Sequence, residues 1–385
     1  MTSNFSASGV DLDDIFAPRS WFNDNNQSLY VWGDNTAGVL GVNRAAASAS
    51  AVFGPLKVEP LANWSKISVG GNFMNALKTD GSLWGWGEGN DGRNGTGSTV
   101  DRSSPVQIGT DTDWIFLNNG IRHGFTIKAD GTLWVWGNNT FGELGVNNRT
   151  NSSNLIQLGT DEWSNASAGV YFSCAIKTDG SLWSWGSASL GKLGLGALVN
   201  RSSPVQVGAL TNWQSVSSAY THSAAIKTDG TLWVWGDGGI GKLGLNSTID
   251  RSSPTQVGVS TDWSKVFAGP GRTFAIKTDG TLWAWGGGVS GRNGLNNQIN
   301  YSSPVQVGTL TNWSSVSAGA YHTIATKTDG TLWAWGDNSR GALGNSDTSQ
   351  TDRSSPIQVG TSTDWQSISA GIDTSAGILK TKSII

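Results

Sequence analysis

Seven copies of one short phrase place the strongest constraint on this fold. Residues 327–336 read KTDGTLWAWG, and five close copies precede it, with a truncated seventh, SLYVWG, near the N-terminus. Each copy ends in a Trp-Gly pair, and successive pairs lie 54, 50, 49, 50, 50 and 50 residues apart. Periods of this size are typical of propellers and solenoids, and about fifty residues hold roughly four short strands with their turns. Seven units therefore predict seven blades.

Each phrase predicts a β-hairpin. The pair Asp329-Gly330 suits the positive φ angles of a two-residue type I′ turn. The β-branched and aromatic run from Thr331 to Trp335 favours the return strand. Trp333 and Trp335 lie two residues apart, so both rings should project from the same face of that strand. Because a lone hairpin is only marginally stable, we expect neighbouring copies to supply the core.

The remainder of each unit predicts two further strands. Arg-Ser-Ser-Pro-Val-Gln-Val-Gly at 201–208, with near copies at 102–109, 251–258 and 353–360, reads as a strand that begins near a proline. Another strand begins at a tryptophan that follows an acidic or amide residue. These seven tryptophans are Trp64, Trp114, Trp163, Trp213, Trp263, Trp313 and Trp365. Because large rings fill the gap between stacked blades, we expect the tryptophans at repeat positions to be core.

The two ends of the array complete each other. The last unit stops without its Asp-Gly turn or Trp-Gly strand, and the first begins with that missing strand. We therefore expect the strand near 378–380 to pair with residues 29–32, which closes the ring and removes two exposed sheet edges. The predicted fold is all-β: a seven-bladed β-propeller over residues 21–385, closed by its N- and C-terminal strands.

Residues 1–20 lie outside the repeat and form a predicted N-terminal extension. They place Val10, Leu12, Ile15 and Phe16 among three aspartates. Such a segment can pack loosely on the rim of the ring, or it can be an attachment peptide that orders on a partner.

Composition limits the classes of partner. The formal net charge is −3 and the basic residues are spread through the repeats, so no electrostatic footprint for nucleic acid or an anionic membrane is present. No apolar run approaches the ~20 residues that span a bilayer, and no signal peptide is recognisable. The single cysteine rules out an intramolecular disulfide. We expect a soluble protein that binds neither nucleic acid nor membrane.

The residues that could carry chemistry have structural explanations. His123, His222 and His322 each stand five residues before the lysine of their unit, far apart around the ring and without ligands at metal-binding spacing. The other units have Phe73, Phe172, Arg272 and Ser375 at that position. Cys174 falls at a position that is mostly apolar elsewhere, which favours a buried thiol. No reaction class follows from this inventory, so we expect no enzymatic activity, no cofactor and no metal.

The variable positions predict a binding face. Just before the histidine position, two residues per unit vary while their surroundings stay fixed, and these loops should surround one mouth of the ring. The large side chains offered there are Arg122, Tyr171, Tyr220, Arg272 and Tyr321. Tyrosine and arginine are favoured at protein interfaces, so we predict these five as binding residues. The alternative is that the loops merely lack packing constraint.

The motifs resemble those of the regulator of chromosome condensation repeat family. The match consists of AGAYHT at 318–323, DGTLWAWG at 329–336 and GALG at 341–344, and its repeats cover residues 28–385. The resemblance implies a seven-bladed propeller, closed by a strand from each terminus, that acts by binding. The family includes nuclear exchange factors for a small GTPase, a secreted bacterial inhibitor of β-lactamases, and bacterial and phage proteins without assigned role. Membership does not choose among these functions.

Several functions therefore remain open. The leading hypothesis is a non-enzymatic protein-binding or structural propeller, specifically a tail- or capsid-associated component of a phage virion. Its partner would be a virion protein or a host surface component. The alternative is a soluble inhibitor or lectin-like binding module. A guanine-nucleotide exchange factor is less favoured, because the chain lacks a basic tail.

Overall fold

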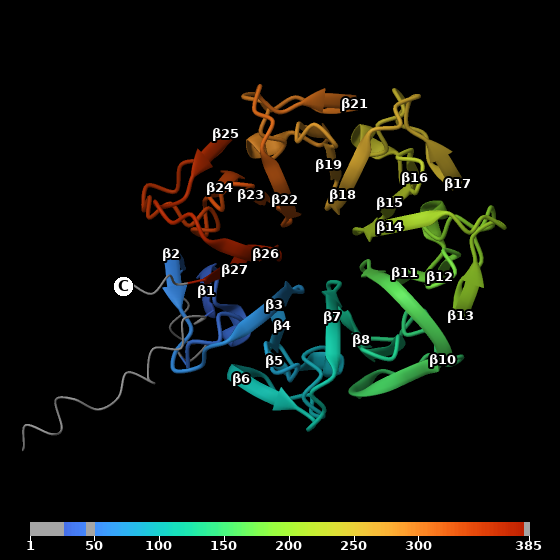
Figure 1. Cartoon of the computed structure of the whole chain (residues 1–385), viewed down its shortest axis with the longest axis horizontal. Helices are drawn as coiled ribbons and strands as arrows, with labels where there is room; N and C mark the ends of the chain where they lie inside the picture. The colour runs from blue at the N-terminus through green and yellow to red at the C-terminus, as the bar shows by residue number, and fades with distance from the viewer. Residues whose placement is uncertain (1–26, 44–50, 381–385) are drawn as a thin grey trace, which may run out of the picture.

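The chain forms a closed ring of seven antiparallel blades, and the computed structural model describes residues 27–43 and 51–380 (Figure 1). The predicted extension 1–20 lies outside the described residues. Five blades are separate four-stranded sheets, and the other two share one long strand and form a seven-stranded sheet. The prediction of an all-β seven-bladed propeller is confirmed.

Every blade has the same order of strands from the centre of the ring outward. Blade 1 contains β3 (Trp64–Val69), β4 (Phe73–Lys78), β5 (Leu83–Gly87) and β6 (Arg102–Ile108). Blades 2 and 3 contain β7 (Trp114–Asn119), β8 (His123–Lys128), β9 (Thr132–Gly137), the shared β10 (Ser152–Ala168), β11 (Phe172–Lys177), β12 (Leu182–Gly186) and β13 (Arg201–Gln206). Blade 4 contains β14 (Trp213–Ser218), β15 (His222–Lys227), β16 (Leu232–Gly236) and β17 (Arg251–Gln256). Blade 5 contains β18 (Trp263–Gly269), β19 (Arg272–Lys277), β20 (Leu282–Gly286) and β21 (Tyr301–Gln306). Blade 6 contains β22 (Trp313–Ala318), β23 (His322–Lys327), β24 (Leu332–Gly336) and β25 (Arg353–Gln358).

Blade 7 closes the ring, as the sequence predicted. It contains β26 (Trp365–Ala370), β27 (Thr374–Lys380), β1 (Gln27–Gly33) and β2 (Val52–Lys57). Strand β27 pairs with β1 in one unbroken register that runs from Gln27 opposite Lys380 to Gly33 opposite Thr374. That register also corrects the sequence alignment. Thr374, not Ser375, occupies the histidine position of blade 7, because Leu379 and not Lys380 stands opposite Trp365.

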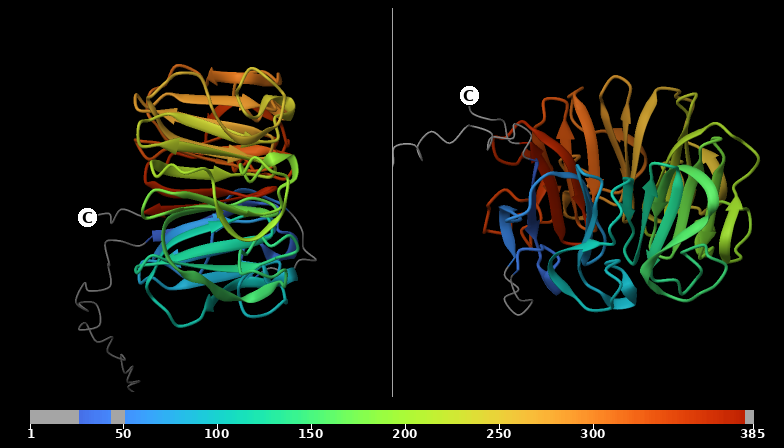
Figure 2. Two further views of the ribbon diagram at one scale, coloured as in Figure 1. Left: turned by 90° about the vertical axis from the view of Figure 1, so that its right-hand side faces the viewer. Right: turned by 60° about the horizontal axis from the view of Figure 1, so that its bottom comes forward.

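The strands run across the thickness of the ring, so each blade contributes loops to two opposite faces (Figure 2). We call one the loop face. In blade 6 it carries the loop 319–321 and the long loop 337–352. The other is the turn face, which carries the Asp-Gly turn at 328–330 and the link 359–364 to the next blade. Short 3-10 helices begin the long loops of five blades: η2 (Thr36–Gly38), η4 (Asn90–Gly92), η5 (Ser189–Gly191), η6 (Gly239–Gly241) and η7 (Val289–Gly291).

The hairpin turn differs from the predicted type I′ turn. Only the glycine of the pair Asp329-Gly330 has a positive φ, and its N–H donates to the carbonyl of Lys327 at 2.9 Å. This is the arrangement of a longer hairpin loop with a left-handed glycine. The aspartate carboxylate sets it, because it accepts both the N–H (3.0 Å) and the hydroxyl (2.6 Å) of Thr331. The same hydroxyl accepts the indole N–H of Trp333 at 2.9 Å.

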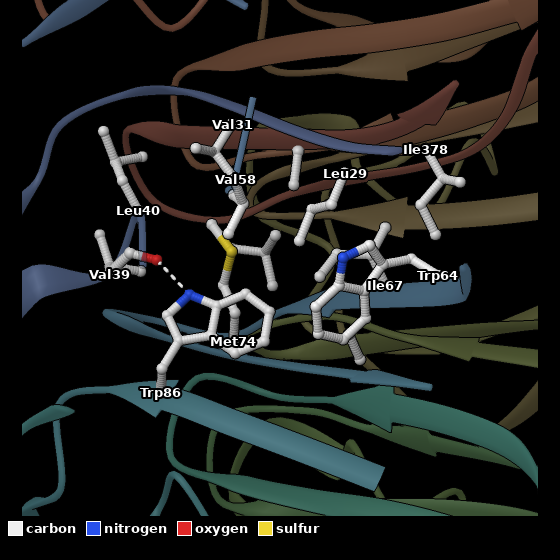
Figure 3. Close-up of a cluster of buried hydrophobic side chains, with 13 residues drawn as sticks. Leu29, Val31, Val39, Leu40, Val58, Trp64, Ile67, Met74, Trp86 and Ile378 are labelled. Carbon is white, nitrogen blue, oxygen red and sulfur yellow. Dashed lines mark hydrogen bonds between the residues drawn. The ribbon is translucent and has the colours of Figure 1, made fainter. Parts of the chain in front are cut away.

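The core lies between neighbouring blades, as expected for this repeat. The second tryptophan of each hairpin copy is fully buried against the preceding blade, and Figure 3 shows Trp86 and Trp64 of blade 1 packed on Leu29, Val31 and neighbouring residues of blade 7. The indole N–H of Trp86 donates to the carbonyl of Val39 at 2.8 Å. Burial of this kind stabilises a protein by about 1.5–3 kcal/mol for each large apolar side chain.

The glycine of each Leu-Gly pair makes room for these rings. At Gly344 a Cβ would stand 2.7 Å from the indole nitrogen of Trp32, and the residue has a φ of +67°. Only glycine satisfies both conditions. The indole of the next blade around the ring therefore packs against the Leu-Gly pair.

The lysine of the hairpin phrase lies over aromatic rings. In blade 6 the Nζ of Lys327 stands 3.5 Å from the ring centre of Trp333 and 5.0 Å from that of Trp313, and these two indoles meet edge to face. The other five complete copies place their lysines in the same way. A cation–π contact thus accounts for the lysine of the repeat.

Candidate functional site on the loop face

All five predicted binding residues belong to the loop face, but their exposure differs. Tyr321 is 51% exposed, and Arg122, Tyr171 and Tyr220 are partly exposed. Arg272 is fully buried. The expectation that its side chain reaches solvent is wrong.

Arg272 joins blade 5 to blade 6. Its Nη2 donates to the carbonyl of Gly319 at 2.9 Å, to the carbonyl of His322 at 2.5 Å and to the hydroxyl of Thr323 at 3.1 Å. Its Nη1 donates to the carbonyl of Ala320 at 3.2 Å. The side chain at the first position of the second strand points at the neighbouring blade. A long side chain with several donors therefore forms its hydrogen bonds with the main chain of that blade.

The three histidines occupy the equivalent position and also bridge blades. The Nε2 atoms of His123, His222 and His322 lie 2.9, 2.8 and 2.7 Å from the hydroxyls of Ser173, Thr273 and Ser375 in the next blade. Each hydroxyl in turn donates its proton to a main-chain carbonyl, at 2.7 to 3.0 Å. The hydroxyls can therefore only accept from the histidines, which assigns the proton to Nε2. This network explains the histidines structurally.

The buried histidines should make stability depend on pH. Burial lowers the pKa of His123, His222 and His322 to about 3, against 6.5 for free histidine. Between about pH 6.5 and pH 3 these histidines are protonated in the unfolded chain but neutral in the folded protein. Their contribution to the free energy of unfolding is therefore complete above about pH 6.5 and is lost as the pH falls toward 3. We expect calorimetry to show a melting temperature that falls over this window. His322→Phe, which copies Phe73 and Phe172, should flatten part of the fall, and an unchanged slope would contradict this explanation.

Cys174 is also accounted for by packing. The thiol is fully buried, and its Sγ lies 3.7 Å from the hydroxyl of Ser223 in the next blade. Burial raises the pKa of the thiol to about 11, which keeps it protonated near neutral pH.

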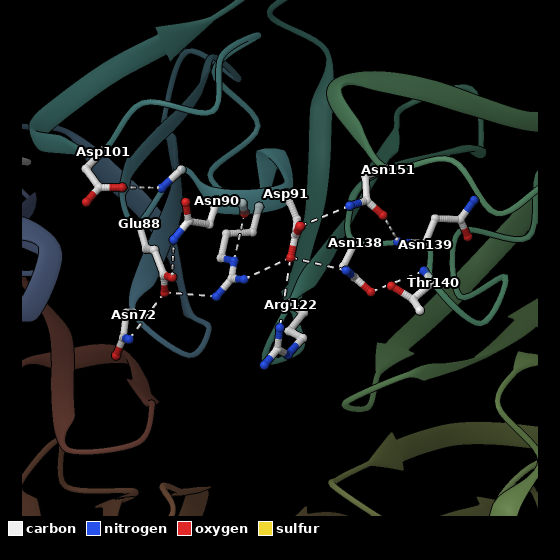
Figure 4. Close-up of polar contacts among 12 residues, drawn as sticks. Asn72, Glu88, Asn90, Asp91, Asp101, Arg122, Asn138, Asn139, Thr140 and Asn151 are labelled. Carbon is white, nitrogen blue, oxygen red and sulfur yellow. Dashed lines mark hydrogen bonds and ion pairs between the residues drawn. The ribbon is translucent and has the colours of Figure 1, made fainter.

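Two of the predicted residues come together at the boundary of blades 2 and 3. The guanidinium carbon of Arg122 stands 5.5 Å from the ring centre of Tyr171, whose ring meets that of Phe141 at 5.0 Å. Figure 4 shows Arg122 beside Asp91 of blade 1, and one of its terminal nitrogens lies 3.9 Å from a carboxylate oxygen of that residue. The sequence analysis did not predict Phe141, because this residue lies in the long loop between β9 and β10 and not in the short loop before β8.

Tyr220 and Tyr321 form a second group near the mouth of the central channel. Burial, and after it the nearby Tyr321 phenol, raise the pKa of Tyr220 to about 12. The Tyr220 phenol is therefore a neutral hydrogen-bonding group at neutral pH. The channel below them encloses about 300 Å³ and is lined by the inner strands of all seven blades.

The hydroxyls that line the channel connect the blades. The hydroxyl of Ser217 accepts the N–H of Ala268 at 2.9 Å, and equivalent Ser or Asn side chains make the same bond elsewhere around the ring. Phe267 stands at this position in blade 5. These polar groups satisfy inner-strand N–H groups, so their role is assembly of the ring.

Exposed apolar side chains recur in the long loops on the loop face of blades 3 to 5, and the sequence analysis missed them. They lie in the long loops that follow β12, β16 and β20, and between 41% and 66% of each is exposed. These residues are Leu190, Leu198, Val199, Ile240, Ile249, Val289 and Ile299. We call this set the apolar arc. Large exposed apolar patches mark interaction sites.

Residues 27–43 and 51–380 contain no group of three or more His, Cys, Asp or Glu side chains that could hold a metal ion. None of the helices in the same residues has the length and apolar character to cross a membrane.

Comparison with known proteins places the chain in a family. The model of the RCC1-like domain matches residues 19–308 and 120–385, so the chain belongs to the RCC1-like domain family. No curated protein matches the sequence significantly.

Solved structures share the fold. Prp20p from Saccharomyces cerevisiae, described with its binding to Gsp1p and histones, is 19% identical with a TM-score of 0.82, over 93% of this chain and 92% of Prp20p. Human WBSCR16 is 20% identical with a TM-score of 0.80, over 93% of this chain and 100% of the human one. Yeast RCC1 (Prp20), solved bound to Kap60, is 17% identical with a TM-score of 0.83, over 100% of this chain and 96% of the other. At these identities the likeness shows the fold.

Proposed function

We propose that this protein is a non-enzymatic binding propeller that holds a protein partner on its loop face. The observation that carries the proposal is the apolar arc, where seven large apolar side chains stand exposed on three consecutive blades. Leaving such surface in water is unfavourable by roughly 25 cal/mol per Å², and a partner would remove it from water.

The groups around the apolar arc have the chemistry of a protein interface. Arg122 of blade 2 lies over the ring of Tyr171 of blade 3, and Tyr321 is exposed on blade 6, next to blade 5. Aromatic and arginine side chains concentrate binding energy where apolar surface surrounds them. Relatives by fold support the proposal too, because Prp20p is described with its binding to Gsp1p and histones, and yeast RCC1 was solved bound to Kap60. Of the predicted residues, Arg122, Tyr171, Tyr220 and Tyr321 remain in the proposed site.

The proposal predicts separate effects on binding and stability. Ile249→Ser and Tyr321→Ala should each weaken partner binding by roughly 1–3 kcal/mol, because each removes an exposed apolar contact. The melting temperature should stay nearly unchanged, since both side chains are largely in water. The partner would first be identified by cross-linking to the unaltered protein, and affinities would then be measured by interferometry.

A matched control lies on the opposite face. Val259, in a link on the turn face, is 91% exposed, so Val259→Ser removes similar apolar surface away from the proposed site. It should leave partner binding unchanged. Equal loss in Val259→Ser and Ile249→Ser, or no loss in either loop-face variant, would count against the loop face as the binding surface.

The narrower assignments remain predictions. A phage virion component, with a virion protein or host surface component as partner, rests on the uniformity of the repeats. Genes for tail, capsid or baseplate proteins beside this one would support it. A soluble inhibitor or lectin-like module would use the same face. Exchange activity would appear as accelerated nucleotide release from a small GTPase.

A further inference from the structure

A basic side chain recurs on the loop face at one position of the repeat. This position is the sixth residue after the glycine of the Trp-Gly pair. Blade 1 has Arg93 there, and blade 4 has Lys242. In both blades the residue after Trp-Gly is an acid that neutralises it. Glu88 accepts from the guanidinium of Arg93 at 2.9 Å, and Asp237 pairs with the ammonium of Lys242.

Blade 5 keeps the cation but lacks the built-in acid. Arg292 occupies the basic position, and Gly287 stands where the other blades have Glu88 and Asp237. Within residues 27–43 and 51–380, the hydrogen bonds of the Arg292 side chain go only to carbonyls, from Nε to Gly287 at 3.2 Å and from Nη1 to Ala320 at 3.2 Å. A Cβ at Gly287 would stand 2.6 Å from Nη2, so this nitrogen lies where the missing side chain would begin.

A second uncompensated arginine lies directly behind the first. Arg272 donates to the same carbonyl of Ala320 at 3.2 Å, and its other partners are carbonyls and one hydroxyl. Burial, and then the charge of Arg292, lower the pKa of Arg272 well below its usual value. Two like charges held by neutral carbonyls and one hydroxyl would both be stabilised by an anion placed at the exposed one.

The surface around Arg292 could hold a peptide. Ile240 lies against Gly287 and belongs to the apolar arc, and Tyr321 is 51% exposed on the neighbouring blade. Arg292 itself is partly exposed. Blades 6 and 7 have the reverse pattern at these two positions, with Asp337 and Asp34 after Trp-Gly and Ala342 and Val39 at the basic position. Blade 5 thus combines two arginines with no acid of its own at the position after Trp-Gly.

We propose that the partner places a carboxylate side chain on Arg292, between Ile240 and Tyr321, and lays flanking apolar residues on the apolar arc. The inference rests on the proposed function and names the chemistry of the partner as an acidic segment with apolar neighbours. Arg292 gains the charge-assisted hydrogen bond that Arg93 and Lys242 find within their own blades.

The decisive variant rebuilds the missing acid. Gly287→Asp should neutralise Arg292 from within, as Asp237 does for Lys242, and so compete with the carboxylate of a partner. Gly287 has no positive φ, and the atoms nearest its added Cβ are the ends of two flexible side chains, so the substitution can be accommodated. Gly287→Asn has the same shape without the charge and serves as the control. Arg292→Gln removes the cation directly.

The experiment uses the full chain and a fluorescein-labelled peptide of alternating glutamate and leucine, followed by fluorescence anisotropy. We expect Gly287→Asp and Arg292→Gln to weaken peptide binding by roughly 5- to 30-fold, and Gly287→Asn by less than about twofold. Binding to the unaltered protein should weaken with added salt, and Arg292→Gln should reduce that dependence.

Two outcomes would overturn the inference. One is equal peptide affinity for the unaltered protein, Gly287→Asp and Gly287→Asn. The other is the absence of binding to the unaltered protein at peptide concentrations of about 1 mM, where even an affinity of about −4 kcal/mol is measurable. Neither result touches the proposed function, which the Ile249→Ser and Val259→Ser comparison tests with the cross-linked partner. Conversely, the peptide could bind through Arg292 while Ile249→Ser left partner binding unchanged. That result would support the Arg292 site and contradict the proposed function of the loop face.

Discussion

Deleting residues 376–385 is expected to lower the free energy of unfolding by roughly 5 kcal/mol or more, which approaches the whole stability of a typical domain. Strand β27 lies between β26 and β1 and pairs with both, so its loss removes two hydrogen-bonded ladders. Ala376 and Ile378, both fully buried, would leave the cluster that joins blade 7 to blade 1. The two new strand edges would also favour aggregation. Calorimetry and size-exclusion chromatography measure both effects.

A shorter truncation provides the control for this experiment. A chain that ends at Lys380 keeps every described strand and should melt with the full-length protein. A protein without residues 376–385 that melts within about 2 °C of the full chain would show that the ring does not depend on its closing strand.

Replacing Arg272 by methionine should cost about 3 kcal/mol of stability, within a range of roughly 2–5 kcal/mol. Methionine has similar length, but the carbonyls of Gly319 and His322 would lose the Arg272 donor inside the protein, and that of Ala320 would keep only Arg292. Stability measured in denaturant should show the loss as a lower midpoint without a change of slope. Arg122→Ala, on the surface of the same face, should change stability by less than about 0.5 kcal/mol.

The repeat itself provides the rescue for Arg272. Arg272→His installs the residue that blades 4 and 6 have at this position, and its Nε2 can reach the hydroxyl of Thr323, as that of His222 reaches Thr273. We expect it to recover part of the stability lost in Arg272→Met. If Arg272→His is no more stable than Arg272→Met, the bridge between blades is not what this position contributes.

The sequence predicted the fold well because packing repeats with the chain. Tryptophans at fixed positions and an incomplete unit at each end were enough to place the blades and the closing strand. The turn type was predicted wrongly, because the pair Asp329-Gly330 also fits a turn in which the carboxylate binds Thr331. The final unit was aligned one residue out, because Lys380 resembles the repeat lysine while Leu379 occupies its place. Motif letters alone do not give strand register.

The candidate site was harder to predict, because exposure is a property of neighbours that repeat alignment does not show. Arg272 varies between units like a surface residue, yet its side chain crosses to the next blade. The apolar arc was missed for the opposite reason, since valine and isoleucine in a repeat suggest core. The uncompensated charge of Arg292 became visible only once contacts in blade 5 could be compared with those in blades 1 and 4.

The closing blade also sets the order in which this protein can be completed during synthesis. The hydroxyl of Thr374 in β27 donates to the carbonyl of Asp34, 340 residues earlier in the chain. At about 5–20 residues per second, β1 leaves the ribosome on the order of tens of seconds before its partner strand exists. Throughout that interval the buried side chains Leu29, Val31 and Trp32 have no seventh blade to enter. The nascent ring is thus most vulnerable to chaperone capture and strand exchange at its oldest residues, and both should end when the last strand arrives.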